Sequence, residues 1–117
     1  QENVDNMKRI VDLIQTHAGS DTAVIFTLSP VPLNATFTNR PTIVSDCVSK
    51  SILRVSLDEF FRTDNHKHIY YWPSFEMVRW VGAHTDMPTL FEDDTTRHVN
   101  NDIVKIIIEN FVSKFFK

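Results

Sequence analysis

The fold is decided by the stretch Phe26-Thr27-Leu28-Ser29-Pro30-Val31-Pro32-Leu33-Asn34-Ala35-Thr36-Phe37. It begins at the end of the apolar run Ala23–Phe26, which predicts a strand covered on both faces. The two prolines fix φ and lack an N–H, so the strand cannot continue through them. In α/β sheets ligands bind at strand ends of this kind, so we expect the loop to form one wall of a site.

Helical and extended segments alternate along the chain, as the spacing of its apolar residues shows. The predicted elements are helices over 4–17, 45–62, 74–81 and from about 101 onward, strands over 23–26 and 68–72, and long loops over 29–43 and 82–97. We expect Ser45 to cap the second helix and Asn100 or Asn101 to cap the last. Helix-separated strands predict a parallel sheet with right-handed crossovers, within a single domain over residues 1–117.

Two strands do not form a stable sheet alone, which favours further strands outside these 117 residues. The chain also begins at Gln1 rather than at a methionine, with the first helix following almost at once. We therefore expect the partner of this segment to be an upstream part of the same polypeptide. An open sheet edge also favours self-association, so a homo-oligomer is expected for the segment alone.

Composition narrows the classes of protein. The hydrophobic fraction of 42% and charged fraction of 23% are typical of a globular chain, and the net charge of −3 gives no basic field for nucleic acid or an anionic membrane. Cys47 is the single cysteine, which excludes an intrachain disulfide. No signal peptide or membrane-spanning run is seen, so we expect a cytoplasmic protein. We also expect no cofactor.

Several polar residues precede or begin predicted helices, where free N–H groups favour an anion. Ser49 and Lys50 lie in one such segment, although capping and solvation explain them as well. His66 and His68 alternate at a strand entry, but no third metal ligand is evident, so solvent exposure is expected and no metal site is assigned. His98 follows an acidic loop, and a carboxylate near a histidine can fix its tautomer during nucleophilic catalysis.

Three segments resemble motifs of the GSCFA family, a branch of the SGNH-type hydrolases. They are Thr27–Leu33 with Ala35-Thr36, Cys47–Arg54, and Tyr71–Val78, followed in the family's order by the acidic loop with His98 and the closing helix. The likeness spans nearly the whole chain. It implies an α/β fold of three layers, α/β/α and flavodoxin-like, of which this chain would form the C-terminal part.

The resemblance also implies a serine nucleophile, contributed from upstream, and an Asp-x-x-His pair near the C-terminus. In such a site the histidine takes the serine proton and the aspartate orients the histidine. His98 matches the general base, but Thr95 stands where the family pattern has aspartate. Asp94, four residues before His98, is then the candidate orienting residue. The substrate-binding residues implied by the three motifs are Ser29, Pro30, Ser49, Lys50, Ser74 and Glu76.

Two functions remain open at this point. The first is part of a serine-dependent esterase or O-acyltransferase, acting on acyl-ester substrates such as acylated carbohydrate. The second is a non-catalytic carbohydrate-binding or protein-interaction module that retains the fold. In the second case Tyr71, Trp72 and Trp80 would stack on sugar rings, although aromatic side chains are more often part of a core.

Overall fold

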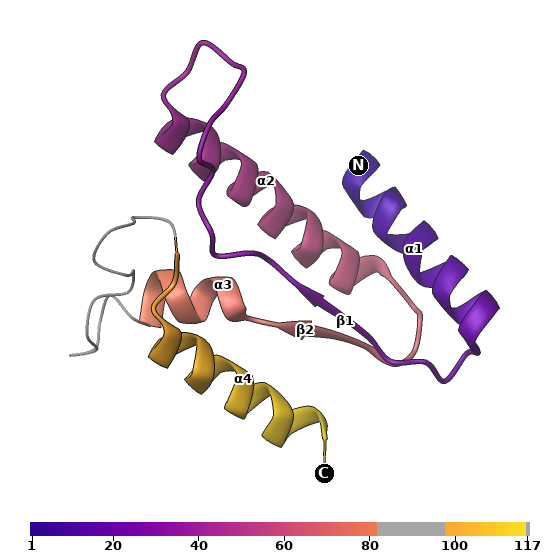
Figure 1. The fold of residues 1–117 in the computed structure, drawn as a ribbon. Coiled ribbons are helices and arrows are strands. Elements are labelled where there is room, and N and C mark those ends of the chain that lie inside the picture. Colours follow the sequence, from indigo (N-terminus) through magenta and orange to yellow (C-terminus); the bar gives the residue numbers. More distant parts are fainter. Residues whose placement is uncertain (82–97, 117) are drawn as a thin grey trace. The chain divides into compact units, whose positions relative to one another are not determined.

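A computed structural model of the chain describes residues 1–81 and 98–116 (Figure 1). The elements are, in order, α1 (Glu2–Ala18), β1 (Val24–Thr27), α2 (Thr42–Thr63), β2 (Ile69–Trp72), α3 (Ser74–Glu76), the π-helical turn η1 (Met77–Val81) and α4 (Asn101–Phe115). The predicted α/β order is confirmed. The loop expected over residues 82–97 lies outside the described residues.

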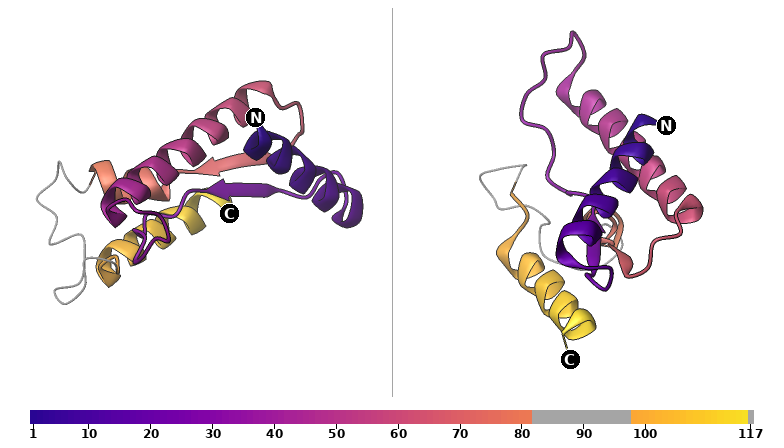
Figure 2. Two further views of the ribbon diagram at one scale, coloured as in Figure 1. Left: turned by 90° about the horizontal axis from the view of Figure 1, so that it is seen from above. Right: turned by 90° about the vertical axis from the view of Figure 1, so that its right-hand side faces the viewer.

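The two strands are hydrogen-bonded neighbours and run in the same direction, as Figures 1 and 2 show. Parallel pairing follows from the helical connection, because a chain that leaves one end of a strand must return along α2 to begin the next. The expected parallel sheet is therefore present as two strands of four residues each.

One predicted boundary is wrong. The second helix begins at Thr42, not after Ser45 as an N-cap. The carbonyl of Pro41 accepts the N–H groups of Val44 and Ser45, both at 3.1 Å. A proline is compatible with the start of a helix because the first N–H groups lack intrahelical partners. Ser45 thus lies inside α2. Asp46 follows the first turn of the helix, and its carboxylate contacts Leu33 and Arg79.

The other helix ends agree with the sequence. The N–H of Gly19, the residue after α1, donates to the carbonyl of Gln15 at 3.1 Å. Gly19 has φ 101° and ψ 148°, backbone angles that residues with a Cβ atom rarely adopt. At the start of α4 the side chain of Asn100 accepts the N–H of Asp102 at 2.8 Å, which decides between the two expected caps.

The described residues form two compact units, and residues 1–26 and 47–71 make up the first. Its core contains Val4 and Val11 of α1, Val24 of β1 and Phe60 of α2. The ring of Phe60 lies 5.1 Å from that of Phe26 and 5.2 Å from that of Phe61, at tilted and edge-to-face angles. Within this unit the apolar stripe of α1 is therefore held against one stretch of α2 and the strands.

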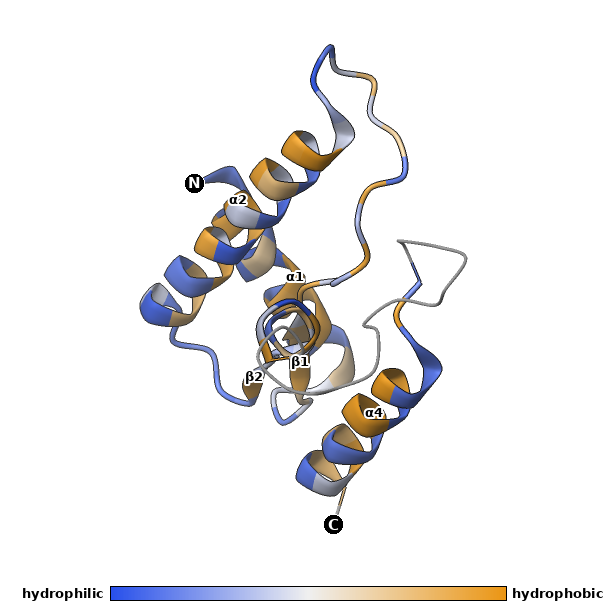
Figure 3. Cartoon of the chain, turned by 90° about the vertical axis from the view of Figure 1, so that its left-hand side faces the viewer, coloured by the Kyte–Doolittle hydropathy of each residue, from blue (hydrophilic) through white to orange (hydrophobic). Residues whose placement is uncertain are grey.

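Of the described residues, 27–46, 72–81 and 98–116 make up the second unit. Its core consists of Val78 in η1 and Ile103 and Ile107 in α4, with Trp72, Met77 and Val99 packed against them. The ring of Trp72 meets that of Phe111 at 5.4 Å and that of Phe115 at 6.1 Å, both edge to face. Figure 3 shows apolar and polar bands alternating along α4, as a helix with one buried stripe requires.

Candidate functional site

The hydroxyl of Ser74 fastens the beginning of α3 to the end of β1. Its Oγ donates to the carbonyl of Leu28 at 3.1 Å and lies 2.6 Å from Oγ1 of Thr27. A serine hydroxyl has one proton, so Ser74 accepts from Thr27 while it donates to Leu28. The ends of the two strands are joined at this point. The single proton of the Ser74 hydroxyl is used in this contact, and its oxygen keeps one further acceptor site.

The loop after β1 is held by a buried carboxylate and a guanidinium. Oδ1 of Asp46 accepts the N–H of Leu33 at 2.9 Å, and Oδ2 accepts Nη2 of Arg79 at 3.1 Å. Nε of Arg79 donates to the carbonyl of Pro30 at 3.1 Å. The side chain of Asp46 is 7% exposed. Inside the loop, the hydroxyl of Ser29 accepts the N–H of Val31 at 3.3 Å.

His98 is exposed and precedes α4, from which Val99 and the capping Asn100 separate it. The next residue, Val99, packs against the second unit's core, and Trp72, the last residue of β2, packs against the same core. The backbone that carries His98 is thus anchored to the cluster at the carboxyl end of β2. Ligands of open α/β sheets bind at this end of the strands.

The predicted site residues are distributed over both units. Ser29, Pro30, Ser74, Glu76 and His98 belong to the second unit. Ser49 and Lys50 belong to the first, where both are half-buried on α2. Asp94 lies outside the described residues. The structure thus brings Ser29 and Pro30 together with Ser74 through Leu28, Thr27 and Arg79, all of which are in the second unit.

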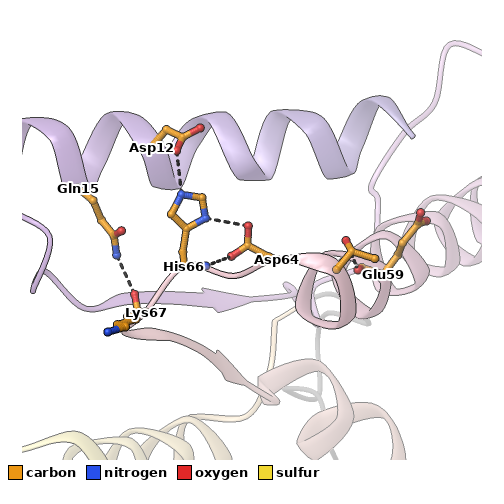
Figure 4. Close-up of polar contacts among 7 residues, drawn as sticks. Asp12, Gln15, Glu59, Asp64, His66 and Lys67 are labelled. Atoms are coloured by element: carbon orange, nitrogen blue, oxygen red, sulfur yellow. Dashed lines mark hydrogen bonds and ion pairs between the residues drawn. The ribbon is translucent and has the colours of Figure 1, made fainter.

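A second polar cluster, in the first unit, centres on His66 (Figure 4). Its Nδ1 lies 2.8 Å from Oδ1 of Asp64, and its Nε2 lies 2.8 Å from Oδ1 of Asp12 in α1. The backbone N–H of His66 donates to Oδ2 of Asp64 at 2.9 Å. The side chain of Asp64 is 2% exposed and that of His66 is 25% exposed. The ring of His66 is partly exposed, as expected, but it is held between two carboxylates. His68, for which exposure was also expected, is exposed.

These contacts change the acidity of the ring. Hydrogen bonds from the imidazolium to Asp64 and then to Asp12 raise the pKa of His66, against a smaller lowering by burial. With both ring nitrogens engaged by carboxylates, His66 has no free position for a substrate proton. It is suited to holding α1 in place rather than to acid–base catalysis. An open depression of about 320 Å³ beside it is lined by Lys8, Thr63, Asp64, Asn65 and His66.

Sequence reasoning missed the contacts of Asp46, Arg79 and Asp64. Each left a weak signal. Arg79 is a charged residue within the apolar run Met77–Val81, and Asp64 stands two residues before a histidine, a spacing that lets a carboxylate reach both the ring and the N–H. Asp46 follows the expected cap Ser45 in the sequence, and both of its oxygens accept hydrogen bonds from other segments.

In residues 1–81 and 98–116 no three His, Cys, Asp or Glu side chains gather in a way that would hold a metal ion. Within those ranges, no helix combines the length and apolar character that crossing a bilayer requires.

Comparison with known proteins assigns the chain to a family. The model of the GSCFA family matches residues 1–111, nearly its entire length. The chain belongs to the GSCFA family. The three motifs named above and the segment that carries His98 all fall within the matched range, so the expected resemblance is confirmed for this GSCFA chain. No curated protein and no solved structure matches it.

Proposed function

We propose that this GSCFA chain supplies the general base of a serine-dependent esterase or O-acyltransferase that acts on acylated carbohydrate in the cytoplasm. His98 is the base and Asp94 its orienting carboxylate. The serine and the remaining strands of a three-layer α/β/α sheet come from a part of the polypeptide upstream of residue 1. Ser29, Pro30, Ser49, Lys50, Ser74 and Glu76 contribute to binding the substrate.

One observation carries the proposal: the exposed His98 precedes Val99, which packs against the same core as Trp72, the last residue of β2. A general base must reach a substrate proton within hydrogen-bond distance, so it has to be accessible and fixed near the ligand-binding edge of the sheet. His98 has both properties within its own unit. The ring of His66 is unsuited to this role, because both of its nitrogens are bonded to carboxylates.

The chemistry follows from these roles. His98 accepts the proton of the serine hydroxyl as its oxygen attacks the ester carbonyl, and the same proton then passes to the departing alcohol. The acyl group is left on the serine until water or a second alcohol takes it. Hydrolysis and transfer differ only in that acceptor. In the sequence, Asp94 stands one residue further from His98 than the family pattern has its aspartate, and the proposal gives Asp94 the orienting role.

The test uses the complete natural polypeptide that contains these residues. We expect a fluorophosphonate to label one serine, and ester cleavage to fall by a factor of roughly 10³ or more in His98→Ala, as is typical for loss of a catalytic base. His17→Ala, at an exposed histidine on α1, is the matched control and should keep wild-type turnover. Unchanged cleavage in His98→Ala would remove His98 from the mechanism.

A carbohydrate-binding module is the second candidate, and the position of Trp80 favours it. The side chain of Trp80 is 60% exposed, whereas Tyr71 packs on Phe61 and Trp72 on Phe111. Only Trp80 of the three thus presents a face for stacking on a sugar. If no serine is labelled and a Trp80→Ala variant loses binding to an acetylated oligosaccharide, this second function replaces the first.

A further inference from the structure

The pair Asp46–Arg79 has features that a surface ion pair lacks. Asp46 is among the most buried polar residues described, and each of its carboxylate oxygens accepts from a different segment. A carboxylate taken out of water is tolerated only when its oxygens are bonded and its charge is neutralised. Leu33 and Arg79 meet these two requirements. The arrangement therefore depends on all three residues together.

Arg79 joins the same loop at a second point. While Nη2 binds Asp46, Nε binds the carbonyl of Pro30, and the guanidinium carbon lies 5.9 Å from the centre of the Phe75 ring. The planar guanidinium presents several donors in fixed directions, so it can bind two acceptors at once. A lysine ammonium in this position would have to give up one of them.

The loop itself offers few other means of fixing its shape. Pro30 and Pro32 have no N–H, which leaves Leu33 as the donor that reaches Asp46. The carbonyl of Pro30 and the N–H of Leu33 are thus both held, three residues apart, by the two members of one ion pair. Ser29 and Leu33, at the two ends of this stretch, are exposed, and Val31 and Pro32 between them are half-buried.

We propose that Asp46 and Arg79 are positioning residues that fix the Ser29–Leu33 loop as a preformed wall for the acyl-ester substrate. This inference rests on the proposed function for the identity of the ligand, but not for the ordering of the loop. A fixed wall lowers the conformational entropy that substrate binding has to overcome. The pair affects the reaction only through the loop and does not touch the reacting atoms.

The first measurement is amide hydrogen exchange of peptides covering residues 29–34, in the complete natural polypeptide. In Asp46→Asn the Leu33 amide should exchange roughly tenfold faster, as expected when a charge-assisted hydrogen bond becomes a neutral one. Arg79→Met should give a similar increase, and Arg79→Lys an intermediate one. Asp58→Asn is the matched control, because it breaks the exposed Asp58–Arg62 pair of α2 and should leave the loop unchanged.

The second measurement is steady-state cleavage of 4-nitrophenyl acetate. Loss of the pair should raise KM roughly tenfold and change kcat less than about twofold, because binding is affected and the base is not. Arg79→Lys should recover part of the KM. A fall in kcat with no change in KM would contradict the assignment of the loop to substrate binding.

The possible results distinguish the positioning role of Asp46 and Arg79 from the esterase activity of the whole protein. Unchanged exchange at Leu33 in both Asp46→Asn and Arg79→Met overturns the positioning role, whatever the activity. Faster exchange in a protein that neither cleaves the ester nor binds a fluorophosphonate supports the ordering of the loop and rejects the esterase. Faster exchange with an unchanged KM rejects the loop as a substrate wall.

Discussion

The Nε2 atom of His66 lies 2.8 Å from Oδ1 of Asp12, and this contact joins the segment after α2 to the middle of α1. Nδ1 is bound to the buried Asp64, and Lys8 lines the adjoining depression. Because both carboxylates favour the imidazolium, the pKa of His66 is raised in the folded state. The folded protein thus binds this proton more tightly than the unfolded chain does, and the difference stabilises the first unit.

The stabilisation by protonated His66 depends on pH. For a raised histidine pKa, the stabilisation is fully present below the unfolded pKa of about 6.5 and is lost as pH rises through the higher folded-state value. We expect this part of the free energy of unfolding to fall across that window, and the exposure of Asp12 to water limits the size of the fall. Urea titrations at a series of pH values measure it. His66→Gln should flatten the profile while His17→Gln preserves it, and an identical slope in His66→Gln would contradict the role.

Phe60 should be the most sensitive position in the first unit's core. It is fully buried and packs on Phe26 and Phe61, so Phe60→Ala leaves a cavity among three rings. We expect a loss of about 3–5 kcal/mol in the free energy of unfolding. Phe37→Ala, at a fully exposed phenylalanine, is the matched control and should change stability by less than about 0.5 kcal/mol. Equal effects of the two substitutions would refute the packing described.

Asn100 should stabilise the protein by capping α4 rather than by packing. Its side chain accepts the N–H of Asp102 at 2.8 Å, so Asn100→Ala should cost about 1 kcal/mol of stability, measured by thermal unfolding. Asn100→Asp should restore most of the loss, because an aspartate both caps the helix and complements its dipole. Failure of the aspartate to recover stability would argue against capping as the cause.

Substitution of Gly19 should affect stability through its backbone angles rather than through a side-chain contact. No atom lies within 4 Å of where a Cβ would stand, yet φ is +101°. Gly19→Ala should therefore lower the free energy of unfolding by about 1–2 kcal/mol through strain alone. Ser20→Ala, one residue later and exposed, should have little effect. If the alanine at position 19 were neutral, the left-handed end of α1 would have to be rejected.

Self-association is expected for residues 1–117 studied alone. Val48, Ile52 and Val55 are exposed at four- and three-residue spacing along α2, which is an apolar stripe suited to a second copy. Light scattering at rising concentration should show species larger than a monomer. Ile52→Lys should shift the distribution toward monomer, and Ser51→Lys, on a neighbouring exposed position, should not. A monomer at every concentration would count against the prediction.

Local signals explain which parts of the fold could be predicted. The apolar spacing of Val4, Val11 and Ile103 gave the helices, and Pro30 and Pro73 gave the strand ends, because each of these acts within its own segment. Proline was misread at one place. The helix was expected to begin after Pro41, at Ser45, whereas the carbonyl of Pro41 itself begins the hydrogen bonding of α2.

The polar contacts were harder to foresee because they join distant segments. Asp46 and Arg79 are separated in the sequence by the rest of α2, by β2 and by α3, and Asp12 reaches His66 only once α1 lies on α2. No local pattern specifies such pairs, since each residue taken alone is as consistent with solvent exposure. The candidate site could be placed by motif at the loop after β1 and at His98, but its supporting ion pair depended on the tertiary arrangement.

The edge-to-face stacking of Trp72 on Phe111 and Phe115 gives the protein a built-in optical reporter. The indole of Trp72 is shielded only while α4 is docked, whereas that of Trp80 is largely in water throughout. In a Trp80→Phe variant, the remaining fluorescence maximum would move to longer wavelength when α4 detaches. Undocking of the helix that follows His98 can then be followed in solution without any added label.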